Sequence, residues 1–109
     1  MAGAKVIVLY PTPLDTQAFE RDYTVDHAPM VTAANFPGIT KFVASKILAT
    51  PDGSPPSYYR VAELHFPSLD ALQKATGSAS AQPVIAHAVS ISTGGRPVFL
   101  VAEEDTRTY

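Results

Sequence analysis

The sequence predicts an α+β fold, in which four antiparallel strands form one sheet and the helices lie on one face of it. Short apolar runs rich in β-branched residues occur at residues 5–10, 39–50, 58–66 and 97–103, and each run is typical of a strand. Helical patterns lie between the first and second runs and between the third and fourth. Proline, glycine and serine mark the connections, and 109 residues suffice for one domain, residues 1–109.

The first strand, residues 5–10, is apolar on both faces, because valine alternates with isoleucine and leucine. A strand of this kind is typically central in its sheet and covered on both sides. Pro11 closes the strand. Asp15 then has the side chain of a helix N-cap, and Leu14 and Phe19 occupy the two positions of a hydrophobic staple.

The first helix carries three rings on one stripe, because Phe19, Tyr23 and His27 follow one another at intervals of four residues. Pro29 lacks the N–H that would continue the helix, and its ring clashes with the preceding turn. The helix is therefore expected to kink or end near His27, and a second short helical piece is expected over residues 29–34.

The third strand, residues 58–66, follows a Pro- and Gly-rich loop at residues 51–56 that is typical of an exposed hairpin. Alternation along this strand predicts two faces. One face is expected to carry Ala62, Leu64 and Phe66. The other face is expected to carry Tyr59, Val61, Glu63 and His65.

The last third of the chain predicts a helix that Ser68 caps, with Leu69 and Leu72 directed inward and Gly77 at its end. The segment that follows is rich in small residues and gives a weak pattern, from which a further helical piece is expected to begin near Gln82.

This order of elements, βαββαβ, predicts a ferredoxin-like unit when both crossovers are right-handed. The helix-free face of the sheet is also apolar, so it needs a cover, and an identical subunit is the simplest one. A homodimer with two sheets packed face to face is therefore expected. The tail, residues 105–109, is expected to be loosely held unless a partner docks it.

Composition excludes several classes of function. The net charge is −2 without a basic cluster, so neither nucleic acid nor an anionic membrane surface is an expected partner. The chain has no cysteine, which excludes disulfides, thiolate metal sites and a cysteine nucleophile. The first residues lack the features of a signal peptide and the length of a membrane span, so a cytoplasmic protein is expected.

At this point the chain resembles the EthD family, named for ethyl tert-butyl ether degradation. One matching segment is His27-Ala28-Pro29-Met30, which resembles the His-x-Pro signature of the family. The other matching segments are Val8-Leu9-Tyr10-Pro11, Asp15 with Phe19 and Tyr23, Phe36-Pro37-Gly38-Ile39, and residues 62–72. The resemblance covers most of the chain.

The resemblance implies a dimeric α+β barrel and, as in many such proteins, a cofactor-independent enzyme for small hydrophobic oxygenated compounds. Reactions in this group include lactone isomerisation, polyketide cyclisation or dehydration, and quinone-forming monooxygenation. The activity implied is thus that of an isomerase, a lyase or an oxidoreductase acting on a small carbonyl or phenolic compound.

One segment departs from the family. Relatives often carry an aspartate followed by a phenylalanine before the last strand, whereas residues 86–92 of this chain read Ala-His-Ala-Val-Ser-Ile-Ser. Either His87 takes the place of that acidic residue, or it faces solvent.

His27 is the leading candidate for a catalytic residue, because an imidazole exchanges protons near neutral pH. Tyr23, on the same stripe, is the second candidate. The substrate pocket is expected to include Tyr10, Phe19, Met30 and His65. The alternative for His27 is a structural role, in which the ring bonds free carbonyls at a kinked helix end.

No cofactor and no metal site are expected, because the three histidines show no helical i, i+4 pair and there are no thiolates. Haem binding stays an alternative, since one axial histidine suffices.

Together with the resemblance, these residues predict an enzyme with His27 as general acid/base. The alternatives are a non-catalytic protein that binds small hydrophobic ligands, or an accessory subunit of an oxygenase system.

Overall fold

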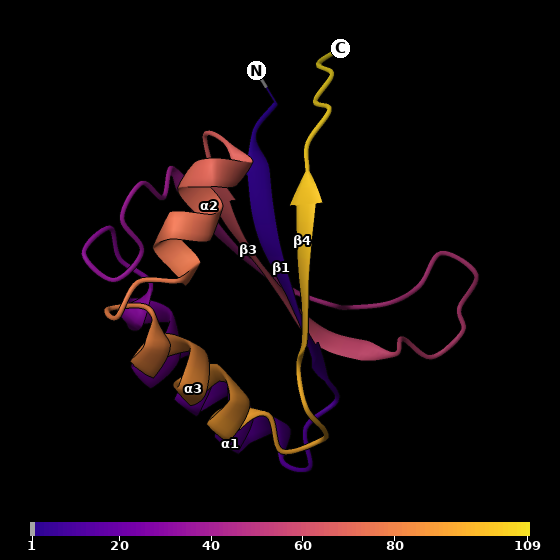
Figure 1. Cartoon of the computed structure of the whole chain (residues 1–109). Coiled ribbons are helices and arrows are strands. Elements are labelled where there is room, and N and C mark those ends of the chain that lie inside the picture. Colours follow the sequence, from indigo (N-terminus) through magenta and orange to yellow (C-terminus); the bar gives the residue numbers. More distant parts are fainter. Residues whose placement is uncertain (1) are drawn as a thin grey trace.

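The central strand of the molecule is β1 (Ala4–Pro11), which pairs antiparallel with β3 (Tyr58–Phe66) on one side and with β4 (Val98–Glu103) on the other. β2 (Lys41–Lys46) pairs with β3 and completes a four-stranded sheet of order β2-β3-β1-β4. This computed structural model describes residues 2–109. The predicted ferredoxin-like α+β fold is confirmed (Figure 1).

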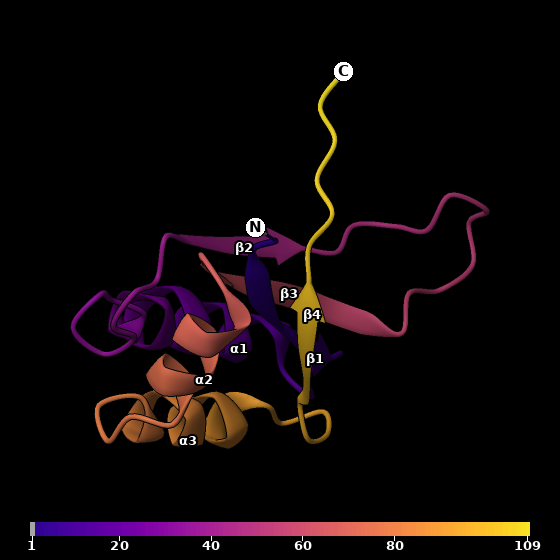
Figure 2. The ribbon, with the colours of Figure 1, turned by 45° about the horizontal axis from the view of Figure 1, so that its top comes forward.

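Alternation along β1 divides the sheet into two faces. Ala4, Val6, Val8 and Tyr10 are buried under the helices, whereas the side chains between them are half-buried on the opposite face. The expectation that β1 is covered on both sides is therefore met on one side only by this chain, because all helices lie on the same face (Figures 1 and 2).

The strand expected over residues 39–50 is shorter, since only Lys41–Lys46 pairs with β3. The connection between β2 and β3 instead projects away from the sheet as a long loop (Figure 1). Asp52 stabilises its tip by accepting hydrogen bonds from Thr50 and Ser54.

A β-bulge changes the face to which Tyr59 belongs. Arg60 lies opposite Tyr10 and Tyr58 lies opposite Pro11, so Tyr59 is an extra residue in β3. Its ring turns toward the helices and meets Phe19 at 5.8 Å. The prediction that Tyr59 shares a face with His65 was thus wrong, because strict alternation does not anticipate a bulge.

The first helical segment changes its winding twice. α1 (Thr16–Arg21) continues as a π-helical segment, η1 (Asp22–His27), and then as a 3₁₀ turn, η2 (Ala28–Met30). Pro29 explains the change, because the wider π turn carries the preceding carbonyls away from its ring. The expected helical piece over 29–34 is reduced to this 3₁₀ turn.

The caps are partly as predicted. The Asp15 side chain accepts a hydrogen bond from the Ala18 amide at 3.1 Å, and Ser68 accepts one from the Ala71 amide at 3.1 Å. The predicted hydrophobic staple between Leu14 and Phe19 was wrong, because Leu14 is 87% exposed and is not part of the core. Leu69 is also partly exposed, so of the two leucines expected to point inward only Leu72 is buried.

Two further helices cover part of the sheet. α2 (Leu69–Thr76) lies over β1 and β3, and α3 (Gln82–Ile91) runs beside the α1–η1 segment (Figures 1 and 2). β4 has no helix directly over it, so Phe99 and Val101 on its helix-side face stay partly exposed. Within residues 2–109, no helix combines the length and the apolar character that a membrane span requires.

The loop before β4 fits tightly against the loop after β1. A Cβ added at Gly94 would overlap the carbonyl of Thr12. We predict that Gly94→Ala lowers the free energy of unfolding by about 2–3 kcal/mol, because backbone must move to admit the methyl group. Chemical denaturation measures this loss. Gly53→Ala is the control, because its site is open and only its positive φ of 80° adds strain, of about 1 kcal/mol; equal losses in the two variants would contradict the prediction.

Candidate functional site: an apolar cavity closed by Tyr10 and His27

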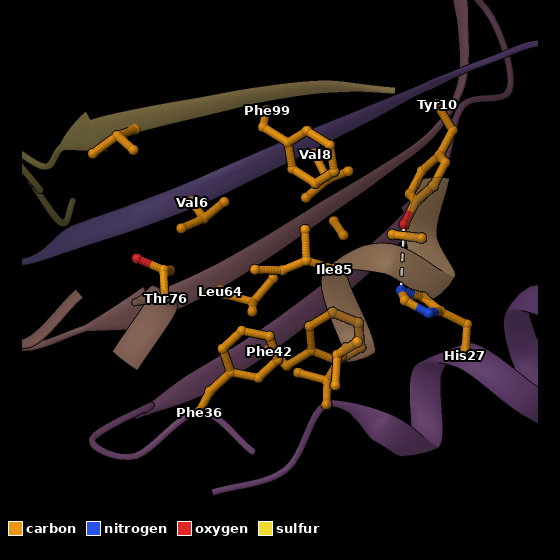
Figure 3. Close-up of a pocket in the computed structure, with 15 residues that line it drawn as sticks. Val6, Val8, Tyr10, His27, Phe36, Phe42, Leu64, Thr76, Ile85 and Phe99 are labelled. Atoms are coloured by element: carbon orange, nitrogen blue, oxygen red, sulfur yellow. Dashed lines mark hydrogen bonds between the residues drawn. The ribbon is translucent and has the colours of Figure 1, made fainter. Parts of the chain in front are cut away.

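A cavity of about 290 Å³ lies between the helix-covered face of the sheet and the helices (Figure 3). All four strands contribute to its wall, together with η1, α2, α3 and the segment after η2. Most of the wall is aliphatic or aromatic. These apolar side chains are Val6, Val8, Val31, Phe36, Phe42, Ala62, Leu64, Val84, Ile85, Ala88, Phe99 and Val101.

The polar groups of the cavity lie at its two ends (Figure 3). Tyr10 and His27 point toward each other at one end, and Thr76 lies at the other. The Thr76 hydroxyl donates to the Leu72 carbonyl of its own helix at 3.0 Å, so its proton is already used. The end with Tyr10 and His27 is therefore where a ligand oxygen would find a hydrogen-bond donor or acceptor.

Tyr10 and His27 come from two elements that pack on each other. Tyr10 is the last helix-side residue of β1 and is 1% exposed, while His27 ends η1 and is 5% exposed. The Tyr10 hydroxyl lies 3.4 Å from Nε2 of His27, which is long for a hydrogen bond. A bound oxygen atom can thus compete for the Tyr10 proton.

The other ring nitrogen of His27 meets a second histidine. Nδ1 of His27 lies 2.9 Å from Nδ1 of His87 on α3, and the two rings stack with centroids 5.1 Å apart. One of the two nitrogens must carry a hydrogen and the other must accept it. His87 is thus half-buried against His27 and does not simply face solvent.

Burial sets the protonation of this site. It lowers the pKa of His27 to about 4, and the nearby His87 acts in the same direction. Burial, with a smaller effect of Tyr23, raises the pKa of Tyr10 far above its usual value. At neutral pH the cavity therefore presents an uncharged imidazole and an uncharged phenol.

Behind the cavity, the predicted stripe forms an aromatic cluster. Phe19 and Tyr23 stack with centroids 5.7 Å apart, and both meet the edge or face of Tyr10 within 5.5 Å. The ring of Tyr23 also lies 5.8 Å from that of His27. The cluster fixes the positions of Tyr10 and His27.

A half-buried ion pair supports this cluster from the side. Arg60 donates to Glu20 at 2.6 Å and lies over the Tyr23 ring at 4.9 Å, and Tyr59 donates to Glu20 at 2.8 Å. Burial alone would raise the pKa of Glu20, but these hydrogen bonds outweigh it and the net shift is downward. Burial raises the pKa of Tyr23 to about 12 although Arg60 opposes it, and the Tyr23 hydroxyl has no partner within residues 2–109.

Of the predicted site residues, Tyr10 and His27 line the cavity together. Phe19 and Tyr23 lie in the layer behind them, because both rings are taken up by packing on Tyr10. Met30, on η2, packs against the edge of the core and is not part of the cavity wall.

His65 lies on the opposite face of the sheet, because its neighbour Leu64 faces the helices. Its Nδ1 is 2.6 Å from a carboxylate oxygen of Glu104, and its Nε2 is 3.5 Å from Glu63. Lys5 pairs with the same Glu63 at 2.8 Å. His65 therefore belongs to a charged cluster away from the cavity, which corrects its expected place in the pocket.

The contact of His87 with His27 is a feature of the candidate site that was not predicted from the sequence. Val84, Ala88 and Ile91 are buried along α3, and His87 falls at the i+3 position of that i, i+4, i+7 pattern. This spacing indicates that His87 lies on the buried side of the helix. The pattern is weak because the segment is rich in small residues. Within residues 2–109, no three His, Cys, Asp or Glu side chains are grouped so that they could hold a metal ion.

The buried imidazole makes stability depend on pH. A folded pKa of about 4 for His27, against 6.5 ordinarily, means that between these pH values the unfolded chain binds a proton that the folded chain does not. We predict that the free energy of unfolding falls as the pH drops through this range, by about 3 kcal/mol from His27. Urea unfolding at several pH values measures it. Because carboxylates titrate there too, the comparison is with His27→Gln, and parallel curves for the two proteins would contradict the prediction.

Comparison with known proteins identifies the family. The EthD domain matches residues 11–88, a range that contains both His27 and His87. An uncharacterized 11.0 kDa protein in the thcB–thcC intergenic region of Rhodococcus erythropolis is 32% identical over 100 residues, which cover 92% of this chain and 94% of that protein.

Solved structures agree. An EthD family protein from Bacillus halodurans is 27% identical with a TM-score of 0.83, covering 96% of this chain and 100% of that one. A dimeric protein of unknown function with a ferredoxin-like fold from Bacteroides fragilis is 12% identical with a TM-score of 0.67, covering 94% and 96%; at that identity the likeness concerns the fold alone. Because the domain match spans more than half of the chain and the Rhodococcus relative matches almost all of it, this chain belongs to the EthD family.

Proposed function

We propose that this EthD protein is a cofactor-independent enzyme that moves a proton on a small hydrophobic carbonyl or phenolic compound, with His27 as the acid/base group. One observation carries the proposal: in a cavity whose wall is apolar apart from Tyr10, His27 and Thr76, Tyr10 and His27 converge at one end. Apolar pockets with a few convergent polar groups are the usual form of small-molecule sites.

The size of the cavity bounds the substrate. Its volume of about 290 Å³ lies between the roughly 150 Å³ of a cavity that holds benzene and the roughly 300–1,000 Å³ of sites for drug-sized ligands. The wall offers no charged group to a ligand apart from the ionisable His27 and Tyr10. A neutral compound of one or two fused rings, with one oxygen directed at Tyr10, fits this description.

The two polar groups have complementary roles in this proposal. Because His27 is neutral at pH 7, Nε2 can accept a proton from a carbon next to a carbonyl. Tyr10 keeps its proton and can donate a hydrogen bond to the oxygen on which negative charge develops. Acid/base help of this kind is worth about 10²–10⁴-fold in rate. Tyr23 acts in this scheme by holding both rings in place rather than by touching the ligand.

The same chain is proposed to form a homodimer through the helix-free face of its sheet. Ile7 and Leu9 lie there beside Leu100 and Val61, and these side chains are half-buried or exposed although they are apolar. These four side chains form an apolar patch on a face that also carries Lys5, Glu63 and His65, and an exposed apolar patch of this kind is typical of an interface. The Bacteroides structure of the same fold is described as dimeric, which supports the proposal.

A non-catalytic binding function is the second candidate, and the pKa of His27 favours it. An imidazole with a pKa of about 4 is a weak base at neutral pH, and in this second function the ring forms a hydrogen bond with a ligand without taking a proton from it. Binding and turnover therefore need to be measured on the same compound.

A bicyclic β,γ-unsaturated ketone of the octalone type tests the catalytic proposal. Its conversion to the conjugated ketone needs one base to move a proton from the α to the γ carbon, and ultraviolet absorbance follows the product. We predict that the wild-type protein accelerates this conversion at least about 10²-fold relative to His27→Gln, because the amide cannot take the proton.

The control for this experiment is Asp26→Asn, since Asp26 precedes His27 on η1 but is exposed. It should leave the rate within about twofold. Calorimetric binding of the conjugated product is measured in parallel. Binding without isomerisation would replace the catalytic proposal by the binding function, and absence of both would reject the cavity as the site.

Two adjacent residues of β4 test the dimer. Leu100 lies on the helix-free face and Val101 on the cavity face, and they are 45% and 61% exposed. We predict that Leu100→Lys converts a dimer into a monomer, because it places a charge in the apolar interface, whereas Val101→Lys leaves the dimer intact. Light scattering coupled to size-exclusion chromatography gives the masses. A monomeric wild-type protein, or the opposite response of the two variants, would contradict the proposal.

A further inference from the structure

The contact between His27 and His87 joins a buried ring to a more exposed one. His27 is 5% exposed and touches the cavity, whereas His87 is half-buried and is not part of the cavity wall. Their Nδ1 atoms are 2.9 Å apart, a distance at which one shared hydrogen makes a good hydrogen bond.

We propose that His87 is the proton acceptor behind His27, so that the Nδ1 hydrogen of His27 passes to His87 while Nε2 of His27 takes the proton of the substrate. The inference rests on the proposed function in that His27 is the group that meets the substrate. His87 touches no ligand in this scheme, so it is a positioning and relay residue.

Hydrogen counting allows two arrangements of the neutral pair. In the first, His27 carries its hydrogen on Nδ1 and donates it to His87, so Nε2 is free to act as a base. In the second, His87 carries the hydrogen on Nδ1, so His27 carries its own on Nε2, and that nitrogen cannot accept the proton of the substrate. Only the first arrangement is ready for reaction.

The transfer balances without a further reactant. The C–H bond at the α carbon breaks as the Nε2–H bond of His27 forms, and the electron pair moves onto the carbonyl oxygen, where Tyr10 donates a hydrogen bond. The Nδ1–H bond of His27 breaks as the Nδ1–H bond of His87 forms, so His87 becomes the imidazolium. The reverse transfers return the proton to the γ carbon and restore both rings.

Burial favours this division of charge. A cation on His27 would be enclosed by apolar side chains and the Tyr10 and Tyr23 rings, which is costly. A cation on His87 is partly solvated. The transfer thus lets a ring that resists protonation act as a base, because the positive charge does not stay on it.

Few other charges face the pair. α3 has no acidic or basic residue besides His87, β1 presents Tyr10, and η1 presents Tyr23 to His27. Of the acidic residues of η1, Asp22 is 3.7 Å from Arg21 and Asp26 is exposed. Within residues 2–109, no carboxylate forms an ion pair with either ring, so the acceptor for the Nδ1 hydrogen of His27 is His87 alone.

Nitrogen-15 NMR of the histidine rings tests the relay without any substrate. The chain has three histidines, and His65→Gln identifies the two signals of interest. We expect the tautomer of His27 to follow the protonation of His87: when His87 becomes a cation, it donates from Nδ1, and His27 must switch to the Nε2–H form while staying neutral. A His27 tautomer that does not change as His87 titrates, or a His27 that is protonated first, would overturn the proposal.

Two substitutions separate proton acceptance from mere orientation. His87→Gln offers an amide oxygen that can accept the Nδ1 hydrogen bond and orient His27 but cannot take the proton, whereas His87→Phe keeps the stacking alone. The relay predicts that both lower kcat for octalone isomerisation by about tenfold or more with little change in KM. It also predicts that the wild-type rate falls when His87 is protonated, because the proton acceptor is then lost, and that both variants lack this fall. A Gln variant as fast as the wild type would overturn the relay and leave His87 an orienting role.

The NMR experiment and the isomerisation kinetics together distinguish the relay from the proposed function. Coupled tautomers without isomerisation would reject the proposed function and keep the proton-sharing pair. Isomerisation without coupled tautomers would keep the function and reject the relay.

Discussion

The packing of the α1–η1 stripe on Tyr10 is the interaction on which the rest of the site depends. Tyr10 is the last helix-side residue of the central strand, and Phe19, Tyr23 and His27 surround it with ring contacts of 5.4–5.5 Å and a 3.4 Å polar contact. The stripe can follow the sheet this far only because the helix widens into a π turn before Pro29. His27 is thereby held at the end of the cavity rather than at a free helix terminus.

Much of the fold could be predicted because strand and helix periods are local properties. The alternation of Val6, Val8 and Tyr10 and the four-residue spacing from Phe19 to His27 depend only on neighbours along the chain, and both were correct. The bulge at Tyr59 was missed because it depends on how β3 pairs with β1. Leu14 was expected in a staple, but nothing in the surrounding fold covers it.

The site was less predictable, because a cavity depends on how elements that are distant in the sequence pack over the sheet. Its wall combines side chains from all four strands and three helical segments, and it includes Phe99 and Val101 of β4, which no local pattern marks as binding residues. Tyr10 and His27 were expected at a pocket, and both line this cavity. The expected pocket also included Phe19, Met30 and His65, which lie in the layer behind the cavity, at the edge of the core and on the other face of the sheet. The partner of His27 lies 60 residues away, and only the helical spacing on α3 pointed to it.

The chemistry of the site turns on a conflict between burial and basicity. The apolar wall that would bind a hydrophobic ligand also lowers the pKa of His27, so the better the cavity excludes water, the weaker its base becomes. Enzymes commonly resolve this conflict with a carboxylate behind the histidine, which stabilises the imidazolium. Here the atom behind Nδ1 belongs to a second, half-buried imidazole. In the proposed relay this partner brings no fixed negative charge to the cavity, and it takes up the positive charge where solvent reaches it.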